Sequence, residues 1–124
     1  MNPLRLILVG MLFALTACAP LFPSPGVTTE TSDFTVEAHA DSWRGRPIVA
    51  GYIYNKRPLR ATSVQLRVEV LDAAGGVVDS GLRRLDRDIN PTDRVYFDVP
   101  PPGEGAAYRV TVDYVFWRPV AGGP

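Results

Sequence analysis

The chain has 124 residues, with 13 Lys and Arg against 13 Asp and Glu, one His and one Cys. This length has room for one domain, and 46% hydrophobic residues is too many for a highly charged disordered protein. Zero net charge argues against the basic stripe that nucleic-acid binding needs, so we expect no nucleic-acid partner. A single Cys excludes an intrachain disulfide and a cysteine-built zinc site.

The first residues of the chain are typical of an export signal. Arg5 precedes an apolar run, Leu6 to Leu15, which is interrupted only by Gly10. About ten apolar residues are too few for a membrane-spanning helix, which takes roughly 20. They match the hydrophobic region of a secretory signal peptide with a short positive segment before it.

The end of this run carries a second motif, which reads Leu15, Thr16, Ala17 and Cys18. It resembles the lipobox of bacterial lipoproteins, in which Leu, a small or polar residue, and Ala or Gly precede a Cys. The resemblance implies cleavage after residue 17, a diacylglyceryl group on the Cys18 thiol and acylation of the new amino terminus. Two or three acyl chains are sufficient for stable anchoring, so the implied partner is a membrane. The alternatives are an ordinary signal peptide with an incidental Cys and an uncleaved signal anchor.

The residue after the lipidated Cys influences sorting in this lipoprotein family. Here it is Ala19, not the Asp that typically retains enterobacterial lipoproteins at the inner membrane. The resemblance therefore implies a lipid-anchored protein of the cell envelope, on the periplasmic face of the outer membrane if the host is Gram-negative.

Residues 18–32 are rich in Pro, Thr and Ser, which favours extended or flexible chain over a packed core. We expect this segment to be a tether between the lipidated Cys and a folded domain. The predicted domain spans residues 33–118, and residues 119–124 are expected to be a disordered tail.

From Asp33 onward the hydrophobic period is two, which is the period of a strand with one buried face. The apolar positions alternate at Phe34–Ala38, Val64–Val70, Val95–Val99 and Tyr108–Phe116. Ile48–Tyr54 is apolar on both faces, and there we expect Val49 and Ile53 to point inward. Turns rich in Gly, Pro and Asn separate these segments, and Gly81 suggests a bulge. Six or seven short strands without an amphipathic helix predict an all-β fold, an antiparallel β-sandwich.

Three segments resemble the immunoglobulin-like or fibronectin-III-like domains of bacterial envelope proteins, particularly the FxLYD-type group. They are Val49–Asn55, Val64–Gly76 and Ile89–Val99, which supply a strand ended by Asn, a strand closed by a Gly hairpin, and a Pro turn before a strand. The resemblance covers Asp33 to Arg118 and implies a binding or scaffolding module. No catalytic residues accompany this fold, so activity cannot be carried over from it.

The residues that could carry catalysis are few. His39 is the only imidazole, and it lies between Glu37 and Asp41 on a predicted strand, where an exposed histidine is the simpler interpretation than a nucleophile's base or a metal ligand. A glycosidase pair would have to come from carboxylates that no motif brings together: Glu30, Glu37, Glu69 and Glu104. We expect no enzyme activity, no catalytic residue, no metal site and no cofactor.

A mixed basic and acidic run spans residues 82–88. The first interpretation is a solvated strand edge with internal ion pairs, where charge also discourages edge-to-edge aggregation. The alternative is a contact for an acidic envelope polymer or for lipid headgroups.

Aromatic residues and arginines supply the candidate binding surface, because Trp, Tyr and Arg dominate interface hot spots and aromatic rings also stack on sugars. All are expected on outward-facing strand positions or in loops: Trp43, Arg44, Arg46, Tyr52, Tyr54, Tyr96 and Trp117. In the alternative interpretation Tyr52 and Tyr54 cover a partly packed second face, and Trp117 closes the end of the sandwich.

Together these patterns predict a non-enzymatic, membrane-anchored binding or scaffolding module whose partner is another protein of the cell envelope. The alternative is a lipoprotein that binds a glycan or small ligand through the same aromatic residues. A lipid-anchored hydrolase is a third hypothesis.

Overall fold

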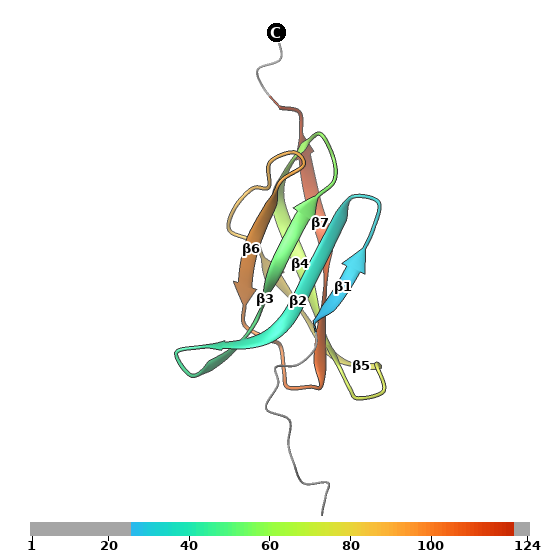
Figure 1. The fold of residues 1–124 in the computed structure, drawn as a ribbon, viewed down its shortest axis with the longest axis vertical. Coiled ribbons are helices and arrows are strands. Elements are labelled where there is room, and N and C mark those ends of the chain that lie inside the picture. The colour runs from blue at the N-terminus through green and yellow to red at the C-terminus, as the bar shows by residue number, and fades with distance from the viewer. Residues whose placement is uncertain (1–25, 121–124) are drawn as a thin grey trace, which may run out of the picture.

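The computed structural model describes residues 26–120, which form seven strands and no helix (Figure 1). The strands are β1 (Val27–Glu30), β2 (Phe34–Trp43), β3 (Arg46–Asn55), β4 (Arg60–Leu71), β5 (Val77–Arg84), β6 (Arg94–Val99) and β7 (Ala107–Arg118). They make two antiparallel sheets, so the predicted antiparallel β-sandwich is confirmed.

The four-stranded sheet A has the order β1-β2-β3-β6, and the three-stranded sheet B has the order β5-β4-β7. Strands β1 to β3 follow one another as a meander. The chain then passes to sheet B at β4, returns to sheet A at β6 and passes again to sheet B at β7. Sandwich folds commonly connect their sheets by such exchanges.

The core lies between the two sheets and follows the alternation of the sequence. In β4 the inward side chains Val64, Leu66, Val68 and Val70 are all fully buried. They pack in one cluster with residues of sheet A that include Ile53. Burial of each such side chain stabilises the fold by up to about 1.5–3 kcal/mol, and this packing holds the sheets together.

The predicted boundary between tether and domain lies too late in the chain. Val27–Glu30 form β1, which pairs with β2 from Val27↔Ala38 to Glu30↔Thr35. The Thr-rich composition suggested a linker, but β-branched residues also fit an edge strand well. The folded domain therefore begins before residue 33.

The alternation in the last strand changes phase, which the sequence pattern does not reveal. Asp113 is an extra residue between the pairs Leu66↔Val112 and Gln65↔Tyr114. A bulge of this kind moves the following side chains to the opposite face. Tyr114 and Phe116 are consequently exposed, and it is Val115 and Trp117 that pack against the core.

The predicted bulge at Gly81 is wrong, because Gly81 pairs in register with Val68 and the irregularity lies opposite Val70 and Leu71. Gly81 instead allows a close approach. A Cβ built there would lie 3.1 Å from Cβ of Pro102, in the connection that covers this edge of the sandwich.

One end of the sandwich is closed by buried polar contacts around Asn55. This side chain is fully buried, and its Nδ2 lies 2.8 Å from the carbonyl oxygen of Leu59 and 3.2 Å from those of Ile89 and Asn90. Its Oδ1 accepts a hydrogen bond from the backbone N–H of Arg57 at 2.9 Å. The Asn55 side-chain amide thus forms hydrogen bonds with both the turn between β3 and β4 and the segment before β6.

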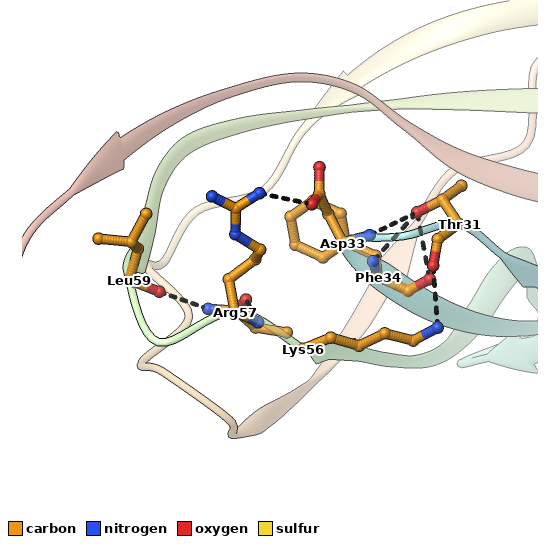
Figure 2. A network of polar contacts seen from close by, with 7 residues as sticks. Thr31, Asp33, Phe34, Lys56, Arg57 and Leu59 are labelled. Atoms are coloured by element: carbon orange, nitrogen blue, oxygen red, sulfur yellow. Dashed lines mark hydrogen bonds and ion pairs between the residues drawn. The ribbon is translucent and has the colours of Figure 1, made fainter.

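Two long side chains extend this closure to the turn between β1 and β2 (Figure 2). Lys56 Nζ donates to the carbonyl oxygen of Thr31 at 2.8 Å and pairs with Glu30, and Arg57 Nη1 lies 3.0 Å from Asp33 Oδ1. We call the end formed by these contacts and Asn55 the tied end of the sandwich.

Candidate functional site

The outer faces of the two sheets differ in chemistry. On sheet B the charged side chains satisfy one another: Arg67 Nη2 lies 2.9 Å from Asp113 Oδ1, and Arg109 Nε lies 2.8 Å from Glu69 Oε1. The hydrogen bond to Glu69 and its negative charge raise the pKa of Arg109 further above its ordinary value. Most of the charged side chains of β4 and β7 therefore have an ion-pair partner on the same face.

The outer face of sheet A groups three tyrosines on the neighbouring strands β3 and β6, while the exposed aromatic residues of sheet B are Tyr114 and Phe116 on β7. Tyr52, Tyr54 and Tyr96 are 41%, 40% and 43% exposed. Val49 and Ile53 lie fully buried on the opposite face of β3, so the predicted direction of these side chains is confirmed. A one-residue shift in register would have buried the tyrosines.

These side chains form an ordered group. Tyr52 and Tyr96 are direct cross-strand partners, and their rings meet edge to face at 5.7 Å between centroids and an interplanar angle of 70°. The guanidinium carbon of Arg94 lies 4.6 Å from the centroid of the Tyr52 ring. We call Tyr52, Tyr54, Tyr96 and Arg94 the tyrosine face. These side chains lose little conformational entropy when a partner binds, because their mutual contacts already restrict them.

A shallow hollow of about 250 Å³ opens in this face. It is lined by Thr35, Glu37, Tyr52, Tyr54 and Arg94. The hollow therefore combines aromatic surface with hydroxyl, carboxylate and guanidinium groups. This is the mixture that orients a polar partner on an apolar platform.

Acidic groups border the tyrosine face. Partial burial raises the pKa of Tyr96, and the negative charges of Asp98 and Asp41 raise it further. The Tyr96 phenol is therefore held in its neutral, proton-donating form. Glu37 lies in the hollow with Tyr52, Tyr54 and Arg94, whereas Asp98 and Asp41 act on Tyr96.

Two larger hollows have volumes of about 410 and 420 Å³, and the second includes Tyr96 of the tyrosine face in its lining. The first lies among residues of β1, β2 and β7, and the second among residues 83–87 and 96–100. The second includes much of the basic run predicted as a strand edge. Strand β5 is indeed an edge strand, and of the predicted ion pairs Arg87 lies 3.9 Å from Asp86.

Three predicted site residues, Trp43, Arg44 and Arg46, lie apart from the tyrosine face. They sit at the tip of the β2–β3 hairpin, where Trp43 pairs with Arg46 and is 58% exposed. Tyr52 lies six positions after Arg46 on β3, which is about 20 Å. The expected aromatic residues thus form two separate groups.

The prediction that Trp117 is part of the exposed surface is wrong. Its ring stacks on Phe34 at 5.3 Å between centroids, and the guanidinium of Arg57 lies 5.3 Å from its centroid. The cause is the bulge at Asp113, which turns Trp117 toward the core. The alternative interpretation, in which Trp117 closes the end of the sandwich, is the one the structure supports.

Arg94, Glu37 and Thr35 were not predicted from the sequence as neighbours of the tyrosines. The alternation does place Arg94 and Tyr96 on the same face of their strand, but only the structure shows that Arg94 lies opposite Tyr54. Which strands are neighbours could not be inferred from parity alone.

His39 lies partly exposed on β2, with Nε2 3.7 Å from Asp41 Oδ2. In residues 26–120 no group of three His, Cys, Asp or Glu side chains could hold a metal ion. The same residues include no helix long and apolar enough to cross a membrane. The predicted lipobox residues Leu15, Thr16, Ala17 and Cys18 lie outside the described part of the chain.

Fold and surface together define a small antiparallel β-sandwich with an exposed tyrosine-rich face on its larger sheet. No protein-family model matches the chain, and no curated protein sequence matches it. Among solved structures, it is similar to the crystal structure of a DUF1425 family member from Shewanella sp. pv-4. The sequence identity is 15% and the TM-score is 0.37, over 81% of this chain and 94% of that one.

Proposed function

We propose that this protein is a lipid-anchored, non-enzymatic binding module of the bacterial cell envelope, and that its tyrosine face binds another envelope protein. The observation that carries the binding role is the ordered contact of Tyr52, Tyr96 and Arg94 on an otherwise open sheet. The lipobox at Leu15–Cys18 supports the anchor, and the exchange of strands between two sheets supports an immunoglobulin-like domain.

The contrast between the sheets supports the choice of face. On β4 and β7 of sheet B, Arg67 pairs with Asp113 and Arg109 pairs with Glu69, so a partner there would have to displace these ion pairs. On sheet A the tyrosines offer apolar area and hydroxyl groups without that cost. Residues of this kind carry most of the binding energy in protein interfaces.

The charge around the tyrosine face specifies the partner further. Glu37 lies in the hollow with Tyr52 and Tyr54, and Asp41 and Asp98 act on Tyr96, so we expect Lys or Arg side chains on the complementary surface. Opposite charge at the rim raises the rate of association and selects orientation. We therefore expect binding that weakens as salt concentration rises.

Affinity capture from host envelopes with Tyr52→Ala and Tyr96→Ala variants tests this proposal. Both substitutions remove exposed rings and should abolish recovery of the partner while leaving the melting temperature nearly unchanged. Tyr114→Ala is the matched control, because Tyr114 is 53% exposed on sheet B. Equal recovery by all three variants would contradict the tyrosine face as the binding surface.

The lipid anchor needs its own test. Intact-mass spectrometry of the membrane fraction should show loss of the first 17 residues and the mass of acyl chains on residue 18, and Cys18→Ser should prevent both changes. An unprocessed chain, or a free Cys18 thiol in the exported protein, would exclude the anchor and leave the binding face as a separate question.

A second function is favoured by the hollow beside Tyr54, in which aromatic rings lie next to Glu37 and Arg94. A saccharide could stack on the rings while the charged groups bind its hydroxyls. Saturable binding of envelope glycan fragments that is lost in Tyr54→Ala, without capture of a protein, would favour this function over the first.

A further inference from the structure

The hairpin between β2 and β3 extends beyond both of its neighbours in sheet A. Strand β1 pairs with β2 only as far as Ala38, and β6 pairs with β3 only as far as Val49. Residues 39–48 are therefore a two-stranded extension, which we call the finger. Figure 1 shows it projecting from the side of the sandwich.

The finger does little for the core. Every residue from Asp41 to Pro47 is exposed. Exposed hairpins of two strands are marginal on their own, so this one depends on the sheet behind it. Ala40 at its base packs against the core, but the exposed residues 41–47 have a fixed shape and are a candidate contact surface.

The tip of the finger is ordered and carries a specific set of groups. Arg44 and Gly45 have φ values of 53° and 77°, which are those of a tight two-residue hairpin turn. The guanidinium carbon of Arg44 lies 4.4 Å from the centroid of the Trp43 ring. With Arg46 the tip has two positive charges, and the sequence from Ser42 to Pro47 contains no acid.

The finger points toward the side from which the chain enters the domain. β1 begins at Val27 opposite Ala38 and runs antiparallel to β2, so β2 continues past Ala38 in the direction from which residue 26 arrives. Five further residues carry β2 to Trp43, a distance of about 17 Å.

The chain between Cys18 and the folded domain limits the distance between that domain and a lipid anchor at Cys18. Gly26 is eight positions after Cys18. Eight residues span at most about 29 Å. A domain held within this distance by an acylated Cys18 has the tip of the finger within reach of the headgroup layer.

From these observations we infer that the finger is a second membrane contact, in which Trp43 enters the interface of an anionic bilayer and Arg44 and Arg46 bind lipid phosphates. This inference rests on the lipid anchor proposed above. Trp is the side chain that favours the membrane–water interface, and basic residues near it are attracted to anionic headgroups. The contact orients the domain, and it leaves the tyrosine face free for its partner.

The protein provides its own optical probe for this contact. It has two Trp residues, and Trp117 is packed between Phe34 and Arg57. Lipids with brominated acyl chains quench only an indole that reaches them. In the acylated protein on vesicles of phosphatidylethanolamine and phosphatidylglycerol, brominated lipid should therefore quench the Trp43 emission. Trp43→Phe should remove all lipid-dependent quenching, and Trp117→Phe should retain it.

The charge of the tip is tested in the same system. Arg44→Gln with Arg46→Gln should reduce the quenching, and so should replacement of phosphatidylglycerol by phosphatidylcholine. Absence of quenching in vesicle-bound wild-type protein, or quenching that persists in Trp43→Phe, would overturn the inference. Quenching that is the same with neutral lipid would overturn the phosphate contact.

Failure of natural acylation can be separated from failure of the finger. Cys18 is the only Cys in the sequence. A chain of residues 18–124, which contains all seven strands, can therefore be coupled at that thiol to a maleimide lipid. Quenching in this form supports the finger contact whatever the host does to Cys18. Absence of quenching overturns the contact, because the lipid anchor has then been attached chemically.

Discussion

Strands β2 and β3 are paired along their whole length, but their two ends differ. At the tied end Asn55 is fully buried and contacts three backbone carbonyl oxygens, and Lys56 reaches across to the turn after β1. At the finger the same two strands pair with no further strand of residues 26–120. One end of the hairpin thus contributes to the stability of the domain, whereas the other presents side chains to its surroundings.

The two ends of this hairpin cover the same residue type, Trp, to different extents, because different neighbours pack on each ring. Phe34 and Arg57 pack on Trp117 at the tied end, whereas Trp43 in the finger contacts Arg44 and is 58% exposed. Substitutions at the two ends should therefore separate stability from binding.

The largest loss of stability is expected for Gly51→Ala in the body of β3. A Cβ at this position would overlap the backbone carbonyl oxygen of Glu37 on β2, and the backbone cannot move aside without disturbing the sheet. The free energy of unfolding in urea should fall by about 3 kcal/mol or more. Gly45→Ala in the finger is the control. It meets no atom within 4 Å and only loses a favourable positive φ, so it should cost about 1 kcal/mol. Equal losses would contradict the difference between the two regions.

Asn55→Ala should have the next largest effect, about 2–4 kcal/mol. The substitution removes the Asn55 partners of the Leu59 carbonyl oxygen and of the Arg57 N–H, whereas the carbonyl oxygens of Ile89 and Asn90 still accept from backbone N–H groups. Buried polar groups that lose their partner each cost about 1–3 kcal/mol. Asn55→Asp keeps the shape but has no N–H to donate and buries a charge, so it should not rescue the loss. Denaturation of both variants at neutral pH measures this, and a stable Asn55→Asp protein would show that the amide donor is unimportant.

Trp117→Ala should cost about 2 kcal/mol, because a half-buried ring loses its contact with Phe34 and leaves a gap at the tied end. Trp43→Ala is the matched control, with an expected change within about 0.5 kcal/mol, as for other exposed positions. Thermal unfolding of the two variants compares the ends of the sandwich with the same substitution. A larger loss for Trp43→Ala would reverse the assignment of the two ends.

The sequence pattern predicted those parts of the fold that depend on local alternation. The directions of Val49 and Ile53, and with them the exposure of Tyr52 and Tyr54, follow from the two-residue period alone. The bulge at Asp113 breaks this period through contacts with β4, which lies far away in the sequence. The direction of Trp117 was therefore beyond reach of local reasoning.

The same limit explains the candidate site. Tyr52 and Tyr96 could each be predicted to face outward, but their edge-to-face contact depends on β3 and β6 being neighbours in register. Asn55 could be recognised as a strand end, whereas its burial depends on the segment around Ile89 closing over it. The contacts of these residues therefore depend on pairing between strands that are distant in the sequence, which the alternation of apolar residues does not specify.

The smallest effect concerns acid conditions at the tied end. Hydrogen bonds from Lys56 and then Thr35 hold the pKa of Glu30 below its ordinary value of 4.5. Since the folded pKa is the lower one, ionised Glu30 adds stability above pH 4.5, and this contribution disappears as the pH falls through the folded pKa. The free energy of unfolding of Glu30→Gln should therefore be closest to that of wild type in the most acidic solutions and fall below it as the pH rises through 4.5.

Glu104→Gln is the control, because Glu104 has no ion-pair partner among residues 26–120. Denaturation series at several pH values compare the three proteins. If the gap between wild type and Glu30→Gln does not change with pH, the contact of Lys56 with Glu30 does not help to hold the β1–β2 turn against β3, and the closure of this end depends on Asn55 and Arg57 alone.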